Sequence, residues 1–424
     1  MNLLPIIILA ICFLMGFPIA FGLILSVIPY FASQTVGLTG IIQKLVANTE
    51  STSLMAIPFF VIAGSIMNYA GVTSRLMNLA DLLVGHLTGG LGHVNVLLST
   101  LMGGLSGSNL ADASMEAKML VPEMERNGYS RSFSTVVTAV SALITPLIPP
   151  GIALIIYGTV AQVSIGKLFV SGLEIGLICC ILMMVLVRII SKKKGYKPMR
   201  TERLPGKELV RITLRALPPL FLPIVIIGGI RIGIFTPTEA GAVSIVYALV
   251  LALVYHEMNF RQFLMAIKES VLSTAQILVI VSAANCLGYI LTVGQVPQAI
   301  TNFMLSIIST KFMFILLVNI FLLIVGMFME GIAAMLILIP LLAPVATAFG
   351  IDPIQFGMIM VFNMSIGTIT PPLGTVMFVT CGVTKCPTKD FLRDCVPFYV
   401  YQLIVLILIS YIPVVSLGIV NLIY

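Results

Sequence analysis

Residues 145–151 read Thr-Pro-Leu-Ile-Pro-Pro-Gly, and residues 368–374 read Thr-Ile-Thr-Pro-Pro-Leu-Gly. Each stretch interrupts a long apolar run. Proline removes a backbone donor and clashes with the preceding turn, so each Pro-Pro pair predicts a helix that is broken inside the membrane. Lipid cannot satisfy the carbonyl groups freed at such a break, so a polar partner must lie beside each one.

The chain that carries these breaks is too apolar for a water-soluble protein. Of its 424 residues, 59% are hydrophobic and 9% are charged, and its mean hydropathy is +1.13. A soluble domain carries about 25% charged residues. Apolar runs of about 20 residues, the length of one crossing, recur about nine times. The sequence therefore predicts an all-α polytopic membrane protein.

The basic residues lie in short clusters between apolar runs, which is typical of cytoplasmic loops and not of a nucleic-acid-binding face. We therefore expect a lipid bilayer, and no nucleic acid, as a partner. The strongest cluster places its connection in the cytoplasm; its members are Lys192, Lys193, Lys194, Lys197, Arg200, Arg203, Lys207, Arg211 and Arg215. The N-terminal run lacks the basic start and cleavage site of a signal peptide, so we expect a retained membrane helix.

The chain also aligns with itself at an offset of 222 residues. The matches include Gly104 with Gly326, Pro122 with Pro344, Gly128 with Gly350, Pro149-Pro150 with Pro371-Pro372, and Phe169 with Phe391. Counting spans from the basic connection gives the two copies opposite orientations. An inverted repeat of this kind is a signature of secondary transporters.

The repeat predicts a division of the chain into three parts. Each copy contains an apolar hairpin interrupted by small or polar residues, which predicts re-entry into the membrane, followed by a discontinuous helix. The first predicted repeat is 1–190, with a hairpin at 92–126 and a broken helix at 130–161. A cytoplasmic basic loop and linking helix follow at 191–236. The second predicted repeat is 237–424, with a hairpin at 312–349 and a broken helix at 353–384.

The helix breaks are candidate binding sites for ions and solute. Freed carbonyls and hydroxyl groups suit a small cation such as Na⁺, while half-helix N-termini attract an anion such as a carboxylate. We expect one Na⁺ site among Ser106, Ser108, Asn109 and the turn that holds Thr145, Pro149, Pro150 and Gly151. We expect a second among Gly326, Glu330, Gly331, Thr368, Thr370 and Gly374. The alternative is that these Gly and Pro residues only kink helices and allow close packing.

Three acidic residues lie in or next to the hairpins. Glu330 interrupts an apolar run, where a carboxylate is either functional or is held by the hairpin backbone or by water at the tip. Asp112 and Glu116 are four residues apart and share a helical face. For this pair we expect a structural or solvated cytoplasmic role.

No enzymatic motif accompanies these features. The chain contains no HExxH, P-loop, GxSxG or CxxC pattern and has three His residues. We therefore expect neither an enzyme nor an ATP-driven pump. Transport energy then comes from an ion gradient, unless the protein is a passive channel.

The tip Gly-Gly-Leu-Ser-Gly-Ser-Asn at 103–109, with Ile-Pro-Pro-Gly at 148–151 and Thr-Pro-Pro-Leu-Gly at 370–374, resembles the large membrane (M) subunit of tripartite ATP-independent periplasmic (TRAP) transporters. The likeness covers essentially the whole chain. It implies an inverted-repeat elevator transporter of the ion transporter superfamily, with two re-entrant hairpins and two discontinuous helices. In this mechanism a mobile domain with both hairpins slides against a fixed scaffold.

The resemblance also implies Na⁺-coupled uptake across the bacterial inner membrane. A soluble periplasmic binding protein would deliver a carboxylate-bearing solute, namely a C4-dicarboxylate, a sugar acid or sialic acid. The small four-helix membrane subunit would be a separate chain, because this sequence has no room for a fused one. Two alternatives remain open, a stand-alone Na⁺/carboxylate symporter without a binding protein and an uncoupled channel or scaffold.

Overall fold

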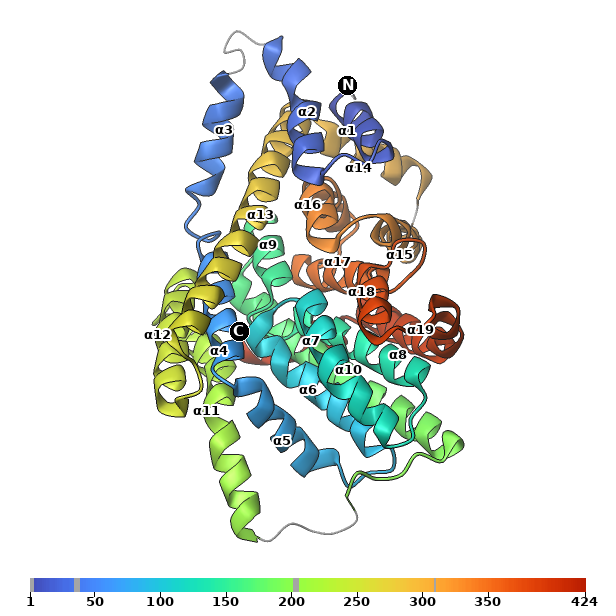
Figure 1. Cartoon of the computed structure of the whole chain (residues 1–424). Coiled ribbons are helices and arrows are strands. Elements are labelled where there is room, and N and C mark those ends of the chain that lie inside the picture. Colours follow the sequence, from blue (N-terminus) through green and yellow to red (C-terminus); the bar gives the residue numbers. More distant parts are fainter. Residues whose placement is uncertain (1–3, 34–38, 201–205, 309) are drawn as a thin grey trace.

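The computed structural model describes residues 4–33, 39–200, 206–308 and 310–424, and every regular element in these ranges is a helix. Seven helices are long and apolar enough to cross a membrane, or up to nine if two bent pairs each count as one span. The chain is therefore an all-α polytopic membrane protein, as its composition predicts. Figure 1 shows the order of the helices along the chain.

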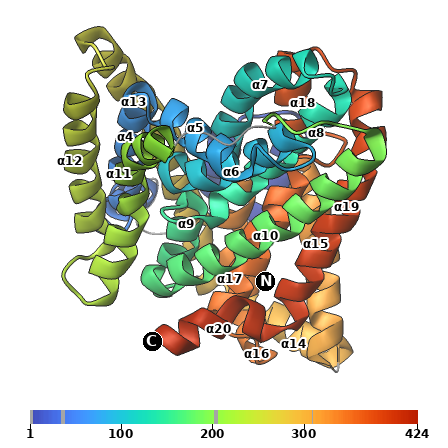
Figure 2. The same cartoon turned by 90° about the horizontal axis from the view of Figure 1, so that it is seen from below.

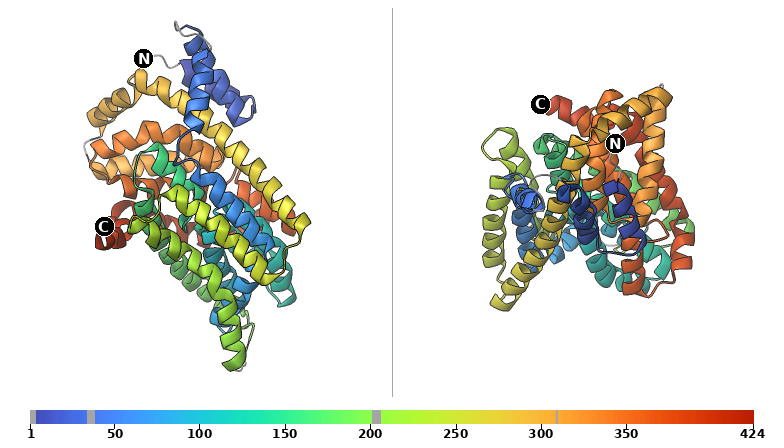
Figure 3. Two further views of the ribbon diagram at one scale, coloured as in Figure 1. Left: turned by 90° about the vertical axis from the view of Figure 1, so that its left-hand side faces the viewer. Right: turned by 90° about the horizontal axis from the view of Figure 1, so that it is seen from above.

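The helices form two groups that are visible from below and from above (Figures 2 and 3). We call the first the side group; it consists of α4 (Ala56–Tyr69), α11 (Gly206–Arg231), α12 (Pro237–Tyr255) and α13 (Phe260–Val293). In this group α4 packs between α12 and α13. The axis of α5 (Val72–Val84) is bent by 72° from that of α4, and α5 packs against α6 and α11.

We call the second the hairpin group. Its two hairpins are α6 (Gly90–Ser106) with α7 (Asn109–Arg126), and α15 (Lys311–Phe328) with α16 (Gly331–Ala348). Its discontinuous helices are α8 (Arg131–Ser141) with η1 (Ala142–Leu147) and α9 (Ile152–Val160), and α17 (Pro353–Gly367) with α18 (Thr375–Thr384). Both Pro-Pro pairs, at 149–150 and 371–372, contain a cis peptide bond.

The remaining helices connect or flank these groups. The long helices α10 (Ile165–Lys194) and α19 (Thr388–Tyr411) follow the two discontinuous helices, and α20 (Pro413–Ile423) ends the chain. The others are α1 (Leu4–Leu14), α2 (Ile19–Ala32), α3 (Thr39–Thr49) and α14 (Val296–Ile307). Of the basic cluster expected in the cytoplasm, Arg203 lies outside the described residues.

The offset of 222 residues reappears in the helix bounds. Adding it to the bounds of α7 gives those of α16, Gly331–Ala348. The contacts are reciprocal as well: α7 packs on α18 as α16 packs on α9, and α8 packs on α19 as α17 packs on α10. The Tyr401 hydroxyl donates to the carbonyl oxygen of Cys179 at 2.8 Å, and these two positions are 222 residues apart. Reciprocal contacts of this kind relate the copies by an approximate two-fold axis. The three-part division of the chain stays a prediction.

The polar segment 260–270 forms the first turns of the 34-residue helix α13. The helix starts at a capping box, in which Asn259 Oδ1 accepts from the Gln262 backbone amide at 2.9 Å and Gln262 Oε1 accepts from the Asn259 amide at 2.8 Å. No proline interrupts it before Gly294, so the polar first turns run directly into the apolar span.

Glycines let the second hairpin lie directly on the second broken helix. A Cβ added to Gly326 on α15 would lie 3.1 Å from the Gly367 Cα, and a Cβ added to Gly367 would collide with the Gly326 backbone. Their equivalents in the first copy are Gly104 and Thr145. A Cβ at Gly104 would lie 3.2 Å from the carbonyl oxygen of Pro149. In both copies a hairpin glycine therefore packs against the backbone of the following helix break.

We predict that Gly367→Ala lowers the free energy of unfolding by about 1–3 kcal/mol, because the new methyl group has no room against Gly326. The matched control is Gly382→Ala in α18, where a Cβ meets nothing within 4 Å; alanine there is expected to be neutral or slightly stabilising. Thermal unfolding of the purified proteins in detergent measures both. Equal unfolding temperatures for the two variants would contradict the predicted close contact.

Candidate functional site

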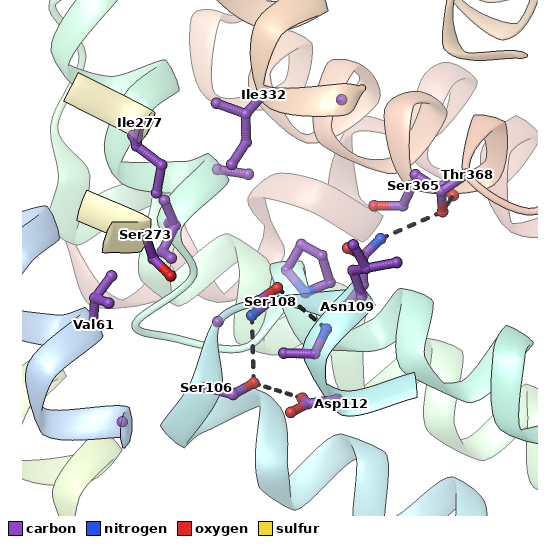
Figure 4. Close-up of a pocket in the computed structure, with 18 of the residues that line it drawn as sticks. Val61, Ser106, Ser108, Asn109, Asp112, Ser273, Ile277, Ile332, Ser365 and Thr368 are labelled. Atoms are coloured by element: carbon purple, nitrogen blue, oxygen red, sulfur yellow. Dashed lines mark hydrogen bonds between the residues drawn. The ribbon is translucent and has the colours of Figure 1, made fainter. Parts of the chain in front are cut away.

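A cavity of about 450 Å³ lies between the side group and the hairpin group. Helices α4 and α13 line one wall, with Val61, Ser273 and Ile277 among the side chains there. Both hairpin tips and the end of α17 line the other wall. Figure 4 shows Ser108 and Asn109 of the first tip inside this space. The cavity is thus located where the two hairpins meet, and both walls contribute polar groups.

The first tip is formed by a left-handed glycine and a capped helix start. Gly107 ends α6 with φ 63°, a conformation that glycine adopts without strain. The Ser108 side chain caps α7 by accepting from the backbone amide of Ala111 at 3.4 Å, and the Ser108 amide donates to Ser106 Oγ at 3.3 Å. Ser106 and Ser108, two residues of the first predicted Na⁺ site, both line the cavity.

A buried carboxylate organises this tip. Ser106 Oγ donates to Asp112 Oδ2 at 2.6 Å, and Thr145 Oγ1 donates to the same oxygen at 2.9 Å. Asp112 is 2% exposed and contributes to the lining of the cavity. The Asp112 side chain therefore joins two predicted ligands, one from the hairpin and one from the helix break.

Of the structural or solvated cytoplasmic role expected for Asp112 and Glu116, the solvated alternative is wrong. Glu116 is 0% exposed, and its Oε2 lies 2.5 Å from Ser99 Oγ. The spacing of four residues does place both acids on one face of α7, but this face packs inward. Helices α6, α8, α18 and the η1 segment cover α7, and so the shared face is buried.

At the second tip, Glu330 occupies the position that Ser108 has in the first copy. It caps α16, because Glu330 Oε2 accepts from the backbone amide of Ala333 at 3.0 Å. Glu330 and Gly331 also line the cavity. The two interpretations of Glu330 are therefore compatible, since one carboxylate oxygen caps the helix while the residue faces the cavity.

The two predicted sites meet in this one cavity. Asn109 Nδ2 of the first tip donates to Thr368 Oγ1 of the second break at 3.4 Å, across 259 residues of sequence. Thr368 Oγ1 donates in turn to the Ser365 carbonyl oxygen at 2.7 Å. Figure 4 shows Asn109 reaching Thr368 on one side of the tip, while Ser106 contacts Asp112 on the other.

The other predicted site residues surround the cavity without lining it, as far as the described residues define it. Pro149, Pro150 and Gly151 are buried beneath the first tip. Gly326 packs against Gly367, Thr370 Oγ1 donates to the Ile366 carbonyl at 2.8 Å, and Gly374 precedes α18. The geometry gives these six positions a role in shaping the tips and breaks.

The carbonyl groups freed at the second break are already hydrogen-bonded to protein. Thr368 O accepts from the Val376 amide at 2.8 Å and from the Met377 amide at 3.3 Å. The Tyr399 hydroxyl donates to Ile369 O at 2.8 Å. The polar partner that this break requires is thus largely supplied by α18 and α19, although each carbonyl oxygen has two lone pairs.

The wall formed by the side group contains polar residues that the sequence reasoning missed. Ser65 and Asn68 on α4, and Glu269 and Ser273 on α13, line the cavity opposite the tips. Glu269 Oε1 accepts from the Tyr69 hydroxyl at 2.8 Å. A sequence signal does exist, because Glu269 and Ser273 are one helical turn apart, but nothing in the sequence shows that this turn faces the hairpins.

The lining residues include three acids, Asp112, Glu269 and Glu330, and no Lys or Arg within the described chain. Positive potential there comes instead from the N-termini of α7 and α16, whose first residues Asn109 and Gly331 line the cavity. Such helix starts attract anions. The cavity therefore combines ligands for a cation with helix ends that favour an anion.

The structure is an all-helical membrane protein in which two hairpin tips meet at one cavity. Two solved transporters have similar folds. The YdaH transporter of Alcanivorax borkumensis matches with a TM-score of 0.60 at 14% identity, over 89% of each chain. MtrF of Neisseria gonorrhoeae matches with a TM-score of 0.62 at 13% identity, over 89% of this chain and 85% of that one.

Sequence comparison identifies the family. The model of the tripartite ATP-independent periplasmic transporter, DctM component, matches residues 6–415, and the chain belongs to this family. It is 40% identical to the sialic acid TRAP transporter large permease protein SiaM of Vibrio cholerae over 94% of this chain and 93% of that protein. It is 39% identical to the C4-dicarboxylate TRAP transporter large permease protein DctM of Pseudomonas aeruginosa over 89% and 88%, respectively. The protein is therefore a TRAP-type solute transporter subunit of the bacterial inner membrane.

We predict that a cysteine at position 108 reacts with a hydrophilic maleimide, while a cysteine at position 99 does not. Ser108 lines the cavity, whereas Ser99 is 0% exposed. The seven native cysteines are all buried, so background labelling is low. The measurement compares Ser108→Cys with Ser99→Cys by mass spectrometry of the intact protein. Equal labelling would show that the cavity extends to Ser99.

Proposed function

We propose that this chain performs the membrane step of Na⁺-coupled uptake of a carboxylate-bearing solute. The TRAP large permease family works with a small membrane subunit and a periplasmic binding protein. In this proposal both are separate chains, and the binding protein delivers the solute to the cavity. The observation that carries the proposal is the cluster of Asp112, Ser106 and Thr145 beside the cavity.

The cluster supports a cation site because its charge has no other partner. Two hydroxyl groups donate to one oxygen of Asp112, so this oxygen acts as an acceptor, as in an ionised carboxylate. None of the ion pairs in the described part of the chain includes Asp112. A buried, unpaired carboxylate beside a cavity is a functional candidate inside a membrane. Carboxylate and hydroxyl oxygens are hard ligands that suit Na⁺.

The second copy supports a weaker cation site. At the repeat positions of Asp112 and Thr145 the chain has Ala334 and Gly367. Glu330 and Thr368 remain as side-chain oxygen donors that line the cavity. We therefore infer two Na⁺ sites with different ligands, of which the one at Asp112 binds more tightly.

A carboxylate solute fits the same cavity once the cation is bound. Without Lys or Arg on the described walls, the helix starts of α7 and α16 and the bound Na⁺ supply the positive charge. Ions and solute then stabilise each other, which is the basis of coupling. Related permeases are named for sialic acid, C4-dicarboxylate and 2,3-diketo-L-gulonate, all of which carry a carboxylate.

An elevator movement would use the two helix groups. The cavity lies at their contact, so sliding of the hairpin group against the side group would move it across the membrane. Its lining residues run along α4 and α13 as far as Asn68 and Glu269, toward the ends near Arg75 and Arg261. Basic residues favour the cytoplasm, so this conformation faces inward.

Uptake into proteoliposomes tests the proposal. The reconstituted complex is supplied with its binding protein and labelled sialic acid, C4-dicarboxylate or sugar acid, with and without an inward Na⁺ gradient. We expect uptake only when both the binding protein and Na⁺ are present. Uptake without the binding protein would support a stand-alone symporter, and uptake without Na⁺ would refute coupling.

We predict that Asp112→Asn raises the Na⁺ concentration for half-maximal uptake by about tenfold or more, because a charged ligand contributes at least about 1.5 kcal/mol. Smaller increases are expected for Ser108→Ala and Asn109→Ala, which remove neutral ligands. The matched control is Glu123→Gln on the same helix, whose carboxylate pairs with Arg126 at 3.5 Å on the surface. An unchanged Na⁺ dependence in Asp112→Asn would remove this carboxylate from the ion site.

A further inference from the structure

Glu116 lies one helical turn beyond Asp112 and does not line the cavity. Its side chain is fully buried, and none of the ion pairs in the described residues includes it. Glu116 Oε2 contacts Ser99 Oγ at 2.5 Å, whereas Oε1 has no hydrogen-bond partner among the described residues. An ionised carboxylate in this position would be strongly unfavourable.

A chain of hydrogen bonds leads away from this carboxyl group, and its direction follows from the donors available. Each hydroxyl has one hydrogen, and a backbone carbonyl only accepts. Thr138 Oγ1 donates to the carbonyl oxygen of Ser134 at 2.9 Å. It therefore accepts from Asn95 Nδ2, which is 2.7 Å away. The Asn95 amide is thereby oriented with its oxygen toward Ser141.

The next two hydrogen bonds use the hydroxyl hydrogens of Ser141 and Ser99. Asn95 Oδ1 is 2.9 Å from Ser141 Oγ and only accepts, so Ser141 donates to it. Ser141 Oγ then has to accept from Ser99 Oγ, which is 2.8 Å away. The single hydrogen of Ser99 is now committed to Ser141. The 2.5 Å contact between Ser99 and Glu116 contains a hydrogen only if Glu116 supplies it.

An ionised Glu116 would leave one contact in this chain of hydrogen bonds without a hydrogen. If Ser99 donated to a Glu116 carboxylate, its contact with Ser141 would need the Ser141 hydrogen. Asn95 Oδ1 would then face Ser141 Oγ at 2.9 Å without a hydrogen between two oxygens. Ser141 has one other acceptor within reach, the Thr138 carbonyl at 3.1 Å, but this too would consume its only hydrogen.

We propose that Glu116 is a proton-binding site, at which a neutral carboxyl group donates to the Ser99 hydroxyl. The neighbouring titratable groups do not provide a countercharge. The elements packed against α7 carry His93 on α6, Arg131 on α8 and Cys381 on α18, and η1 carries none. Arg131 is paired with Glu125, and Asp112 on α7 itself is an acid that would repel a second negative charge.

The repeat shows that folding of the hairpin does not require this acid. The position equivalent to Glu116 in the second copy is Leu338 on α16, and Ser99 corresponds to Phe321. An apolar pair therefore fills the same place in the other hairpin. The two acids of α7 hold different protonation states, with Asp112 ionised at the cavity and Glu116 neutral behind it. One monovalent cation at Asp112 is then sufficient to neutralise the first hairpin.

Infrared spectroscopy of the reconstituted full chain at neutral pH tests the proton directly. The difference spectrum of wild type minus Glu116→Gln is expected to contain the carbonyl band of one protonated carboxyl group. The exposed acid Glu123 provides the matched control, because Glu123→Gln should remove only an ionised carboxylate band. An ionised carboxylate band in the Glu116→Gln difference spectrum would overturn the proposal.

Two further measurements test the proposal: Ser99→Ala serves if Glu116→Gln folds poorly, and a transport ratio serves if the band is weak. Ser99→Ala leaves Glu116 in place but removes its acceptor, so the protonated band is expected to shift in frequency; an unshifted band would refute the donation to Ser99. The Na⁺-to-solute ratio of Glu116→Gln is expected to equal that of wild type. A lower ratio would show that Glu116 is an ionised Na⁺ ligand. The ratio alone rests on the proposed Na⁺ coupling, whereas the spectra do not.

Discussion

Backbone polar groups inside a membrane need hydrogen-bond partners within the protein, and the architecture of this transporter follows from the places where a helix cannot provide them. At the second break, α18 and α19 take over this function, with the Val376 amide bonded to Thr368 O and the Tyr399 hydroxyl bonded to Ile369 O. At the tips, the side chains of Ser108 and Glu330 cap the new helix starts. The cavity lies where these interruptions meet, and polar groups of both tips line it.

The two copies of the repeat cap their helix starts in the same way, but the side chains next to these caps differ. Ser108 and Glu330 occupy equivalent positions and perform the same capping. One turn further on, the first copy has a carboxylate, Asp112, bonded to Thr145, where the second has Ala334 and a close glycine contact. The first copy therefore has a buried carboxylate bonded to a hydroxyl group, and in the second the two backbones pack more closely. Symmetry of fold does not imply two equal sites.

Local patterns were sufficient to predict the helix breaks, the hairpins and the membrane character, since proline chemistry and hydrophobic runs act within a few residues. The positions of Ser106, Ser108 and Asn109 at a polar tip follow from the same local reasoning. The inward orientation of Asp112 does not, because it depends on which helices cover α7. The contact between Asn109 and Thr368 spans 259 residues, and Glu269 reaches the cavity only through the packing of α13 against α4. Such tertiary contacts leave no local signal.

The charge distribution of the cavity explains why cation and anion would bind together. Its described walls carry three carboxylates and no basic side chain, so an anionic solute alone would meet repulsion and only the weak attraction of helix starts. A bound Na⁺ would neutralise Asp112, and a neutral Glu116 would need no second cation there. In a wall of low dielectric constant the loss of this repulsion would be large. In the proposed mechanism, the scarcity of basic residues on the described walls would favour coupling, since a permanent Lys or Arg would bind the solute whether or not an ion had loaded the site.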